Sequence, residues 1–278
     1  CSPVQAQEVV RLGNLKLAHF GAVSYIKEIA PGCGIRVEEK MFAKGLDIMQ
    51  AIIAGELDVG ATASEAAIQG RAGGAKVVVV AGFARGGARL VARPELKIAS
   101  ILQLKGKRVG VTRGGIQEVL LMAELARNKL SADTTVRKDV QLVYLSYPEL
   151  NQALLGRHID AMMQSEPQSS QAINMGFGVE VMKPYGTPIG EPVRTMVMTE
   201  KFYRERRPLA EKFMRCFVQA TRTFIDRPDI AEHYVRQSMF KGQITVADFR
   251  AAMANSPYSY DITPQHIQVT TDVMAQTG

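Results

Sequence analysis

The chain has 278 residues, of which 46% are hydrophobic and 22% charged, and it carries a formal net charge of +7. This composition suits a globular chain of one large or two medium domains, and no apolar run approaches the roughly 20 residues of a membrane-spanning helix. The basic residues are scattered, and their densest run, Arg204 to Arg207, is interrupted by Glu205. We therefore expect no nucleic-acid partner, whereas a basic surface suits a small anionic ligand.

The first residue is a cysteine, followed by Ser2. A chain that begins this way is typical of a mature bacterial lipoprotein, acylated at Cys1 after removal of a signal peptide. The alternative is that residues 4–6, Val-Gln-Ala, are the end of an ordinary signal peptide. Both interpretations predict an exported protein, either periplasmic or membrane-anchored outside the cytoplasm.

The hydrophobic pattern then predicts alternating strands and helices along the chain. The expected strands lie at residues 9–15, 35–38 and 77–81 in the first part of the chain, and within 101–115, at 140–145 and at 178–182 in the next part. The extended segment at residues 89–93, broken by Pro94, is expected to cross into a second lobe. Residues 183–192, which hold three prolines and two glycines, are expected to return.

After this return, a strand at 195–198 is expected to rejoin the first sheet. Helical periodicity then dominates and predicts four helices, at residues 209–225, 230–238, 246–255 and 265–276. We expect this C-terminal helical segment to pack on the first lobe. The predicted division of the chain is 7–93 for the first part of lobe 1, 94–190 for lobe 2, and 191–278 for the rest of lobe 1.

One stretch of the chain occurs twice. Residues 51–58 read Ala-Ile-Ile-Ala-Gly-Glu-Leu-Asp, and residues 153–160 read Ala-Leu-Leu-Gly-Arg-His-Ile-Asp. Both are typical of a helix end, a glycine in a left-handed turn (Gly55 and Gly156) and a short buried strand that runs into a Ser-Glu loop. Two copies are too few for a solenoid, so we predict an α/β fold of two similar lobes. Ligands bind beyond the carboxyl ends of such strands, so the two loops should face each other across a cleft.

Residues 112–115, Thr-Arg-Gly-Gly, are the best anion-binding candidate. Paired glycines before a predicted helix at 116–129 let backbone N–H groups approach a ligand, and the helix dipole favours negative charge. Arg113 could add a bidentate contact to a carboxylate or sulfonate. The alternative is a plain strand-to-helix turn with Arg113 in solvent. The segment is not a phosphate-binding P-loop, because it lacks Gly-Lys-Ser/Thr at the required spacing.

The remaining cysteines, Cys33 and Cys216, could pair, although the sequence does not decide this. No CxxC or Cys-His spacing is present, so we expect no metal site, and we expect no cofactor.

Two motifs carry a resemblance to a known family: Ala-Gly-Glu-Leu-Asp-Val-Gly at residues 54–60 and Leu-Lys-Gly-Lys-Arg-Val-Gly-Val at 104–111. Over roughly residues 9–234 the chain resembles the periplasmic substrate-binding proteins of the nitrate, sulfonate and taurine ABC-importer group, within the NMT1/THI5-like set. The resemblance implies a type II periplasmic-binding fold that closes on a ligand by a hinge. It also implies delivery of a small anionic solute to an inner-membrane permease. We expect a monomer.

The resemblance also places the ligand loops. Carried over, the expected ligand-binding residues are His19, Phe20, Thr62, Ala63, Ser64, Phe83, Thr112, Arg113, Gly114, Gly115, Tyr147, Ser165 and Glu166. His19 could instead be a solvent-exposed loop residue, and Phe83 a core residue. Relatives often carry a Trp-Asp-Pro-like turn where this chain has Ser165-Glu166-Pro167, and the chain has no tryptophan, which argues against an alkanesulfonate. Glu166 would add negative charge, so the ligand should carry a cationic or hydrogen-donating group beside its anionic end.

The alternative to a binding protein is an enzyme of thiamine-pyrimidine or menaquinone-precursor synthesis on the same fold. Such chemistry needs a committed set of His, Cys or Lys side chains, and of the four histidines only His19 falls in a predicted cleft loop. We therefore expect no catalytic residue. The effector domain of a transcription regulator shares the fold, but no helix-turn-helix pattern precedes Val9.

Overall fold

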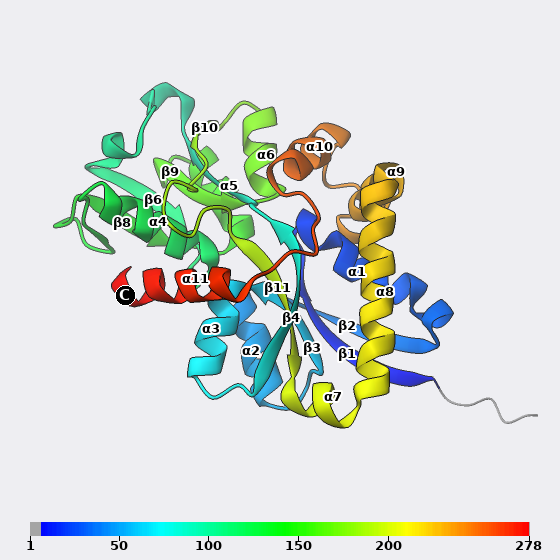
Figure 1. The fold of residues 1–278 in the computed structure, drawn as a ribbon. Coiled ribbons are helices and arrows are strands. Elements are labelled where there is room, and N and C mark those ends of the chain that lie inside the picture. The colour runs from blue at the N-terminus through cyan, green and yellow to red at the C-terminus, as the bar shows by residue number, and fades with distance from the viewer. Residues whose placement is uncertain (1–6, 278) are drawn as a thin grey trace, which may run out of the picture.

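The computed structural model describes residues 7–277 and folds them into two α/β lobes, each built around its own sheet (Figure 1). The first sheet has the order β2-β1-β3-β11-β4, and the second β10-β5-β9-β6-β8-β7. The strands of the first sheet are β1 (Glu8–Leu15), β2 (Ile35–Phe42), β3 (Val59–Ala63), β4 (Val77–Arg85) and β11 (Val193–Thr199). Those of the second are β5 (Ala88–Ala92), β6 (Lys107–Val111), β7 (Ala132–Asp133), β8 (Val140–Tyr144), β9 (Ala161–Ser165) and β10 (Val179–Met182).

The two sheets share one plan. β1 pairs in parallel with β2 and β3, and β6 pairs in parallel with β8 and β9. Each sheet also takes one antiparallel strand with two neighbours, β11 in the first and β5 in the second. Each lobe has its own hydrophobic core, and β3 and β9 are buried throughout, as expected for strands covered on both faces. The predicted fold of two similar α/β lobes is confirmed.

Helices cover the faces of both sheets. Those before the return to the first sheet are α1 (Gly21–Ile29), α2 (Gly45–Ile53), α3 (Ser64–Ala72), α4 (Ile116–Arg127), α5 (Tyr147–Leu155) and α6 (Gln168–Asn174). Those after it are α7 (Glu200–Glu205), α8 (Arg207–Asp226), α9 (Pro228–His233), α10 (Val246–Asn255) and α11 (Pro264–Thr277). Short 3-10 segments add η1 (Ala18–Phe20) and η2 (Ala30–Cys33).

The repeated sequence has the same contacts in both lobes. The backbone N–H of Arg11 donates to Asp58 Oδ2 at 3.0 Å, and its Nη2 donates to Oδ1 at 2.8 Å. In the second lobe the N–H of Arg108 donates to Asp160 Oδ2 at 2.9 Å, and its Nη2 to Oδ1 at 3.2 Å. Each aspartate therefore ties the start of its strand to the neighbouring strand, which explains why the apolar-Asp step occurs in both copies.

One detail of the repeat was predicted wrongly. Gly55 has the expected left-handed backbone, with φ of 76°, but Gly156 does not, with φ of −78°. The left-handed residue in the second copy is Arg157, with φ of 60°. Its carbonyl accepts from Arg108, just as the carbonyl of Gly55 accepts from Arg11. The turn geometry is thus kept without glycine at the equivalent position.

The chain changes sheet between β4 and β5, at Gly86 and Gly87. Both have left-handed backbones, with φ of 66° and 79°, which glycine adopts at little cost. The N–H of Gly86 donates to the carbonyl of Pro192 on the returning segment at 2.9 Å, so the two crossings lie side by side. The sequence pattern placed the first crossing at the segment that ends in Arg93 and Pro94. The structure places it further upstream, because β5 already belongs to the second sheet.

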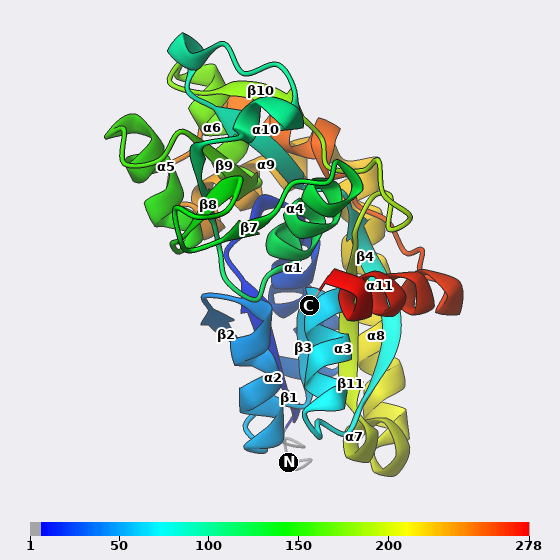
Figure 2. The same cartoon turned by 90° about the vertical axis from the view of Figure 1, so that its left-hand side faces the viewer.

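The C-terminal helices pack mainly on the first lobe, with two exceptions. The long helix α8 packs against α1 and β2, as expected. However, α10 contacts α6 of the second lobe, and α11 contacts both α3 and α4, one from each lobe (Figure 2). The apolar pattern alone did not distinguish these partners.

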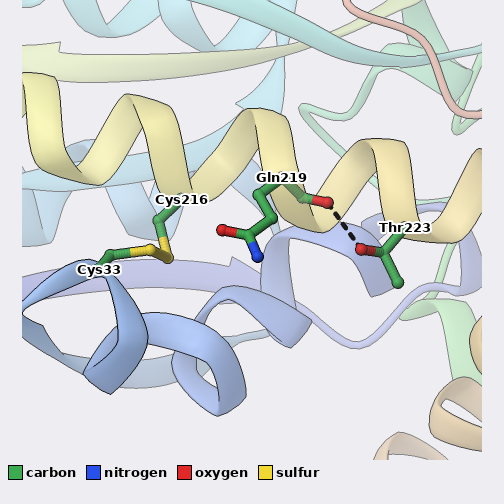
Figure 3. The surroundings of a disulfide bond; sticks show 4 residues. All are labelled: Cys33, Cys216, Gln219 and Thr223. Carbon is green, nitrogen blue, oxygen red and sulfur yellow. Dashed lines mark hydrogen bonds between the residues drawn. A yellow bond between two sulfur atoms is a disulfide. The ribbon is translucent and has the colours of Figure 1, made fainter.

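A disulfide joins Cys33 at the end of η2 to Cys216 on α8, with 6.0 Å between the two Cα atoms (Figure 3). The bond fixes α8 to the first lobe, and it answers the question of pairing that the sequence left open. Cys1, the predicted site of lipid attachment, lies outside the described residues. None of the helices in residues 7–277 is long and apolar enough to cross a membrane.

Candidate functional site

The loops at the carboxyl ends of the parallel strands meet between the lobes. The N–H of Ala18 in the first lobe donates to the carbonyl of Glu166 in the second at 3.3 Å. The start of α3 contacts α4, and a Cβ added to Gly114 would lie 2.8 Å from Leu46 Cδ1 of α2. The lobes therefore touch along these loops, where the sequence predicted a cleft.

Buried polar side chains gather along this contact, and many of their atoms lack a hydrogen-bond partner within residues 7–277. We call the following eight residues the cleft cluster: His19, Thr62, Ser64, Glu65, Thr112, Gln117, Arg194 and Thr195. The unpartnered atoms are both imidazole nitrogens, the four hydroxyls, Glu65 Oε2, Gln117 Nε2 and Arg194 Nε. Each such group costs about 1–3 kcal/mol when buried, so their concentration in one place is typical of a site that binds a polar ligand.

Arg194 is the cation of this cluster and is only 2% exposed. Strand β11 sets it opposite Ala63 at the end of β3. Its Nη2 donates to the carbonyl of Gly86 at 2.8 Å. A Cβ added at Gly87 would lie 3.0 Å from His19 Cε1 and 3.1 Å from Arg194 Nη2, so the imidazole and the guanidinium converge on the first crossing.

The charges of the cluster follow from burial. Burial and the Arg194 charge lower the pKa of His19 well below its usual value, so the imidazole is neutral. Burial raises the pKa of Glu65 to about 7, although Arg194 and the N–H groups of Glu65, Ala66 and Ile116 favour its ionised form. Burial also lowers the pKa of Arg194, but a guanidinium stays protonated in proteins. The cluster therefore holds one lasting positive charge and one acid that titrates near neutral pH.

The second lobe contributes Tyr147 from the start of α5. Its hydroxyl donates to Gln117 Oε1 at 2.5 Å, which leaves Gln117 Nε2 available as a donor. Gly115 is required here, because an added Cβ would lie 2.8 Å from the Tyr147 hydroxyl. Burial raises the pKa of Tyr147, so the phenol stays protonated. These contacts bring Tyr147 against the Thr112–Gly115 loop.

Glu166 has a different place from the one expected. Its Oε1 lies 2.9 Å from Arg89 Nε and accepts from Asn255 Nδ2 at 2.9 Å. Its Oε2 accepts from the hydroxyl and the N–H of Ser170 at 2.7 and 3.2 Å. Both oxygens are thus bound to protein groups and the charge is paired with Arg89. The expectation that Glu166 adds net negative charge to the cleft is therefore wrong.

The loop at residues 112–115 is divided between cleft and surface. Thr112 and Gly115 are buried, but Arg113 is exposed, and its guanidinium lies over the Tyr144 ring at 5.1 Å. The N–H of Gly114 donates to Glu118 Oε2 within α4. Arg113 thus lies at the rim, and the buried guanidinium between the lobes is that of Arg194.

The predicted aromatic residues Phe20 and Phe83 belong to the hydrophobic core of the first lobe, which for Phe83 is the alternative that the sequence left open. Phe20 and Phe83 are both fully buried and pack edge to face, with ring centroids 4.8 Å apart. His19 packs on Phe20 at 5.0 Å and is also fully buried, so its alternative as a solvent-exposed residue is wrong. Ser165 is buried at the end of β9, and its hydroxyl donates to the carbonyl of Gly87 at 3.3 Å.

A groove of about 450 Å³ opens beside this site and is lined by both lobes. Its walls include Lys16, Leu17 and Phe240 on one side, and Tyr147 and Gln168 on the other. Lys16 is the one charged side chain among the described residues that line it, and its Nζ lies 5.3 Å from the centre of the Phe240 ring. Tyr147, which lines the groove, also donates to Gln117 of the cleft cluster.

Sequence reasoning missed Glu65, Gln117, Arg194 and Thr195. Glu65 belongs to the first Ser-Glu loop and Gln117 follows the predicted anion loop, so both were adjacent to predicted positions. Arg194 and Thr195 stand at the start of the returning strand, and no local motif marks them. No group of His, Cys, Asp or Glu side chains within residues 7–277 could hold a metal ion.

Comparison with solved structures identifies the class of fold. The chain superposes on the alkanesulfonate-binding protein SsuA of Xanthomonas axonopodis pv. citri, bound to MOPS, with a TM-score of 0.80, 17% identity, and coverage of 98% of this chain and 93% of that one. It also matches the periplasmic nitrate-binding protein NrtA of Synechocystis PCC 6803, with a TM-score of 0.69, 13% identity, and coverage of 87% and 69%. These likenesses concern the fold, which is the two-lobed architecture of type II periplasmic-binding proteins.

The sequence comparison then gives the family. The NMT1/THI5 like family matches residues 32–231, and the chain belongs to it. A Brachyspira hyodysenteriae protein, provisionally named as an ABC transporter periplasmic binding protein, is 22% identical over 213 residues, which are 71% of this chain and 59% of that protein. An Escherichia coli K12 protein, provisionally named as aliphatic sulfonates-binding, is 29% identical over 174 residues, 62% of this chain and 50% of that protein. The chain thus matches between half and three fifths of these relatives' lengths.

Proposed function

We propose that the protein is the solute-binding subunit of an ABC importer, located outside the cytoplasm. It captures a small organic anion between its lobes and delivers it to a permease in the membrane. The observation that carries this proposal is the cleft cluster, in which a buried guanidinium and several unpartnered donors converge where the two lobes meet. A buried charge without a full set of partners is costly, and an anionic ligand would supply the missing ones.

The family and the fold support the proposal. Relatives in both comparisons are described as periplasmic binding proteins or as binders of sulfonate and nitrate. The disulfide between Cys33 and Cys216 also supports a place outside the cytoplasm, since such bonds persist mainly in oxidising compartments. No observation in residues 7–277 favours the enzyme alternative, because the neutral, buried His19 has no nucleophile or acid as a hydrogen-bond partner.

In this proposal the two lobes hold the ligand in different ways. Arg194 binds the anionic group, and the hydroxyls of Thr62 and Ser64 donate to it from the first lobe. Thr112 and Gln117 donate from the second lobe. Lys16 in the groove and Arg113 at the rim attract the anion from solvent.

The paired glycines at the first crossing are the proposed hinge. Gly86 and Gly87 absorb backbone rotation between β4 and β5, while residues 183–192 follow on the return. The α10–α6 contact would open and close with the cleft, because it joins the C-terminal segment to the second lobe. Small-angle scattering tests this motion, since ligand at saturation should reduce the radius of gyration of the open form.

Native mass spectrometry tests the function itself. Protein purified without denaturation should carry a small anion whose mass is measured directly. Thermal-shift titration with that compound should give a saturable rise in melting temperature, with the compound recovered unchanged. Chemical conversion of the compound at a catalytic rate would instead favour the enzyme. The absence of any compound that binds saturably would overturn the proposal.

A further inference from the structure

Asn255, the last residue of α10, lies where the two chain crossings meet. Its carbonyl accepts from the N–H of Gly87 in the first crossing at 3.0 Å, and the hydroxyl of Tyr185 in the return segment lies 3.5 Å from its Oδ1. Its Nδ2 donates to Glu166 Oε1 of the second lobe at 2.9 Å. Asn255 is 3% exposed and Glu166 is 0% exposed, so the bond between them is shielded from water. One buried residue thus contacts both crossings and the second lobe.

Helix α10 is held on the first lobe by apolar packing. Its Phe249 and Ala252 belong to a hydrophobic cluster with Ala18, Ala22 and Phe224, which come from η1, α1 and α8 of the first lobe. Separating such a cluster would expose apolar surface to water, which is unfavourable. We therefore expect α10 to move with the first lobe when the cleft opens.

The side of α10 that faces the second lobe makes polar contacts instead. Arg89 Nη2 on β5 donates to the carbonyl of Ala251 at 3.1 Å, and Asn174 Nδ2 on α6 donates to Asp248 Oδ1 at 2.8 Å. The buried bond described above is a further contact of this kind. Water can replace the partners of such bonds with little net change in free energy, so we expect them to break and re-form as the lobes move.

The bond between Asn255 and Glu166 differs from the one between Asn174 and Asp248 in what its loss would leave behind. Asn174 is exposed, so water can take its place beside Asp248. In the closed arrangement Glu166 is shielded from water, so without Asn255 its Oε1 would lose a donor that no solvent replaces. In an open arrangement water would reach this oxygen. Loss of the donor therefore penalises the closed arrangement and shifts the protein towards the open one.

We propose that Asn255 is a positioning residue that sets the balance between open and closed lobes through its bond to Glu166. The inference deepens the proposed function and rests on it, because a binding protein whose closed form is scarce binds its ligand more weakly in the same proportion. Within residues 7–277 Asn255 makes no hydrogen bond to the cleft cluster. It therefore acts on affinity through the position of the lobes.

Amide hydrogen exchange followed by NMR, without any ligand, tests the proposal. Two backbone N–H groups report on the contact between the lobes: that of Ala18 donates to the carbonyl of Glu166, and that of Ile116 in the second lobe is hydrogen-bonded to Glu65 in the first. Asn255→Asp sets a second carboxylate against Glu166, so both amides should exchange roughly ten-fold faster or more. Asn255→Ala removes the bond without adding a charge and should give a smaller rise at both amides. Small-angle scattering should show a larger radius of gyration for both variants.

A reversed pair and a matched control make the test specific. The double variant Asn255→Asp, Glu166→Gln exchanges the amide and the carboxylate and keeps the total charge, so it should restore slow exchange at both amides. The control Asn174→Asp makes the same change beside the carboxylate of Asp248, at the exposed part of the same helix contact. It should behave like the wild type, because exposed polar pairs contribute little.

Three results would contradict the proposal. They are wild-type exchange at both amides in Asn255→Asp and Asn255→Ala, faster exchange at Ala18 alone, which indicates a local change in the loop at Glu166, and a double variant that exchanges as fast as Asn255→Asp. Because none of these measurements uses a ligand, such a result leaves the proposed function intact. That function fails separately, when no compound binds saturably. Circular dichroism and the melting temperature establish that each variant is folded.

Discussion

Removal of the Cys33–Cys216 disulfide should destabilise the protein strongly without affecting ligand binding. The bond closes a loop with a sequence separation of 183 residues. Loop-closure entropy for a loop of this length predicts a loss of about 5 kcal/mol in the free energy of unfolding at 25 °C. For a chain of this size, such a loss lowers the melting temperature by about 10 °C.

The bond acts on one particular helix packing. Cys216 is fully buried on α8, in the same core as the neighbouring residues Phe213 and Phe217, and Cys33 ends the segment that follows α1 (Figure 3). Cutting the bond therefore removes the covalent link between α8 and the first lobe, while the apolar packing of α8 on that lobe remains. The cleft cluster lies elsewhere, at the ends of the strands, so the ligand dissociation constant should change by less than about two-fold.

Urea unfolding monitored by circular dichroism measures the effect. Three samples are compared: oxidised wild type, wild type reduced under native conditions, and the Cys33→Ala, Cys216→Ala double variant. The double variant also loses buried sulfur, so the reduced wild type isolates the effect of the covalent bond. A loss below about 1 kcal/mol in the reduced protein would refute the entropic reasoning. A large loss of ligand affinity would refute the separation of α8 from the site.

Four further results are expected. Arg194→Gln should weaken binding of the ligand roughly ten- to a hundred-fold by calorimetry, since one charge-assisted contact is lost. Gly87→Ala should abolish binding of the ligand. The added Cβ would lie 3.1 Å from Arg194 Nη2, and the φ of 79° is strained for alanine. Crystallography of the variant would show the Arg194 guanidinium displaced. Asp58→Asn and Asp160→Asn should each cost about 1–3 kcal/mol in urea unfolding and add in the double variant, since they share no partner. Burial raises the pKa of Glu65 from 4.5 to about 7. The folded state therefore keeps the proton at pH values where the unfolded state has released it, so ionisation favours unfolding. The wild type should lose stability relative to Glu65→Gln as the pH rises from 5 to 8.

Much of the architecture was determined by local sequence. The apolar-Asp step at Asp58 and Asp160 predicted two similar lobes, because each aspartate must cap the same strand pairing in its own sheet. Hydrophobic periodicity likewise predicted α8, whose buried and exposed faces alternate with the helical repeat. The positions of the strand ends predicted which loops of the two lobes lie opposite each other. Residues beyond the carboxyl ends of parallel strands share one edge of a sheet.

Contacts between distant segments were decided only by the tertiary structure. Arg194 enters the site because β11 pairs with β3, a pairing of residues more than a hundred positions apart that no local pattern encodes. Glu166 and Glu65 occupy equivalent Ser-Glu loops and look alike in sequence. Arg89 and Asn255 reach Glu166 but not Glu65, and this difference in partners leaves Glu65 Oε2 without a hydrogen-bond partner within residues 7–277. A side chain's role in a buried site depends on which charges the fold brings to it, and that information is spread along the whole chain.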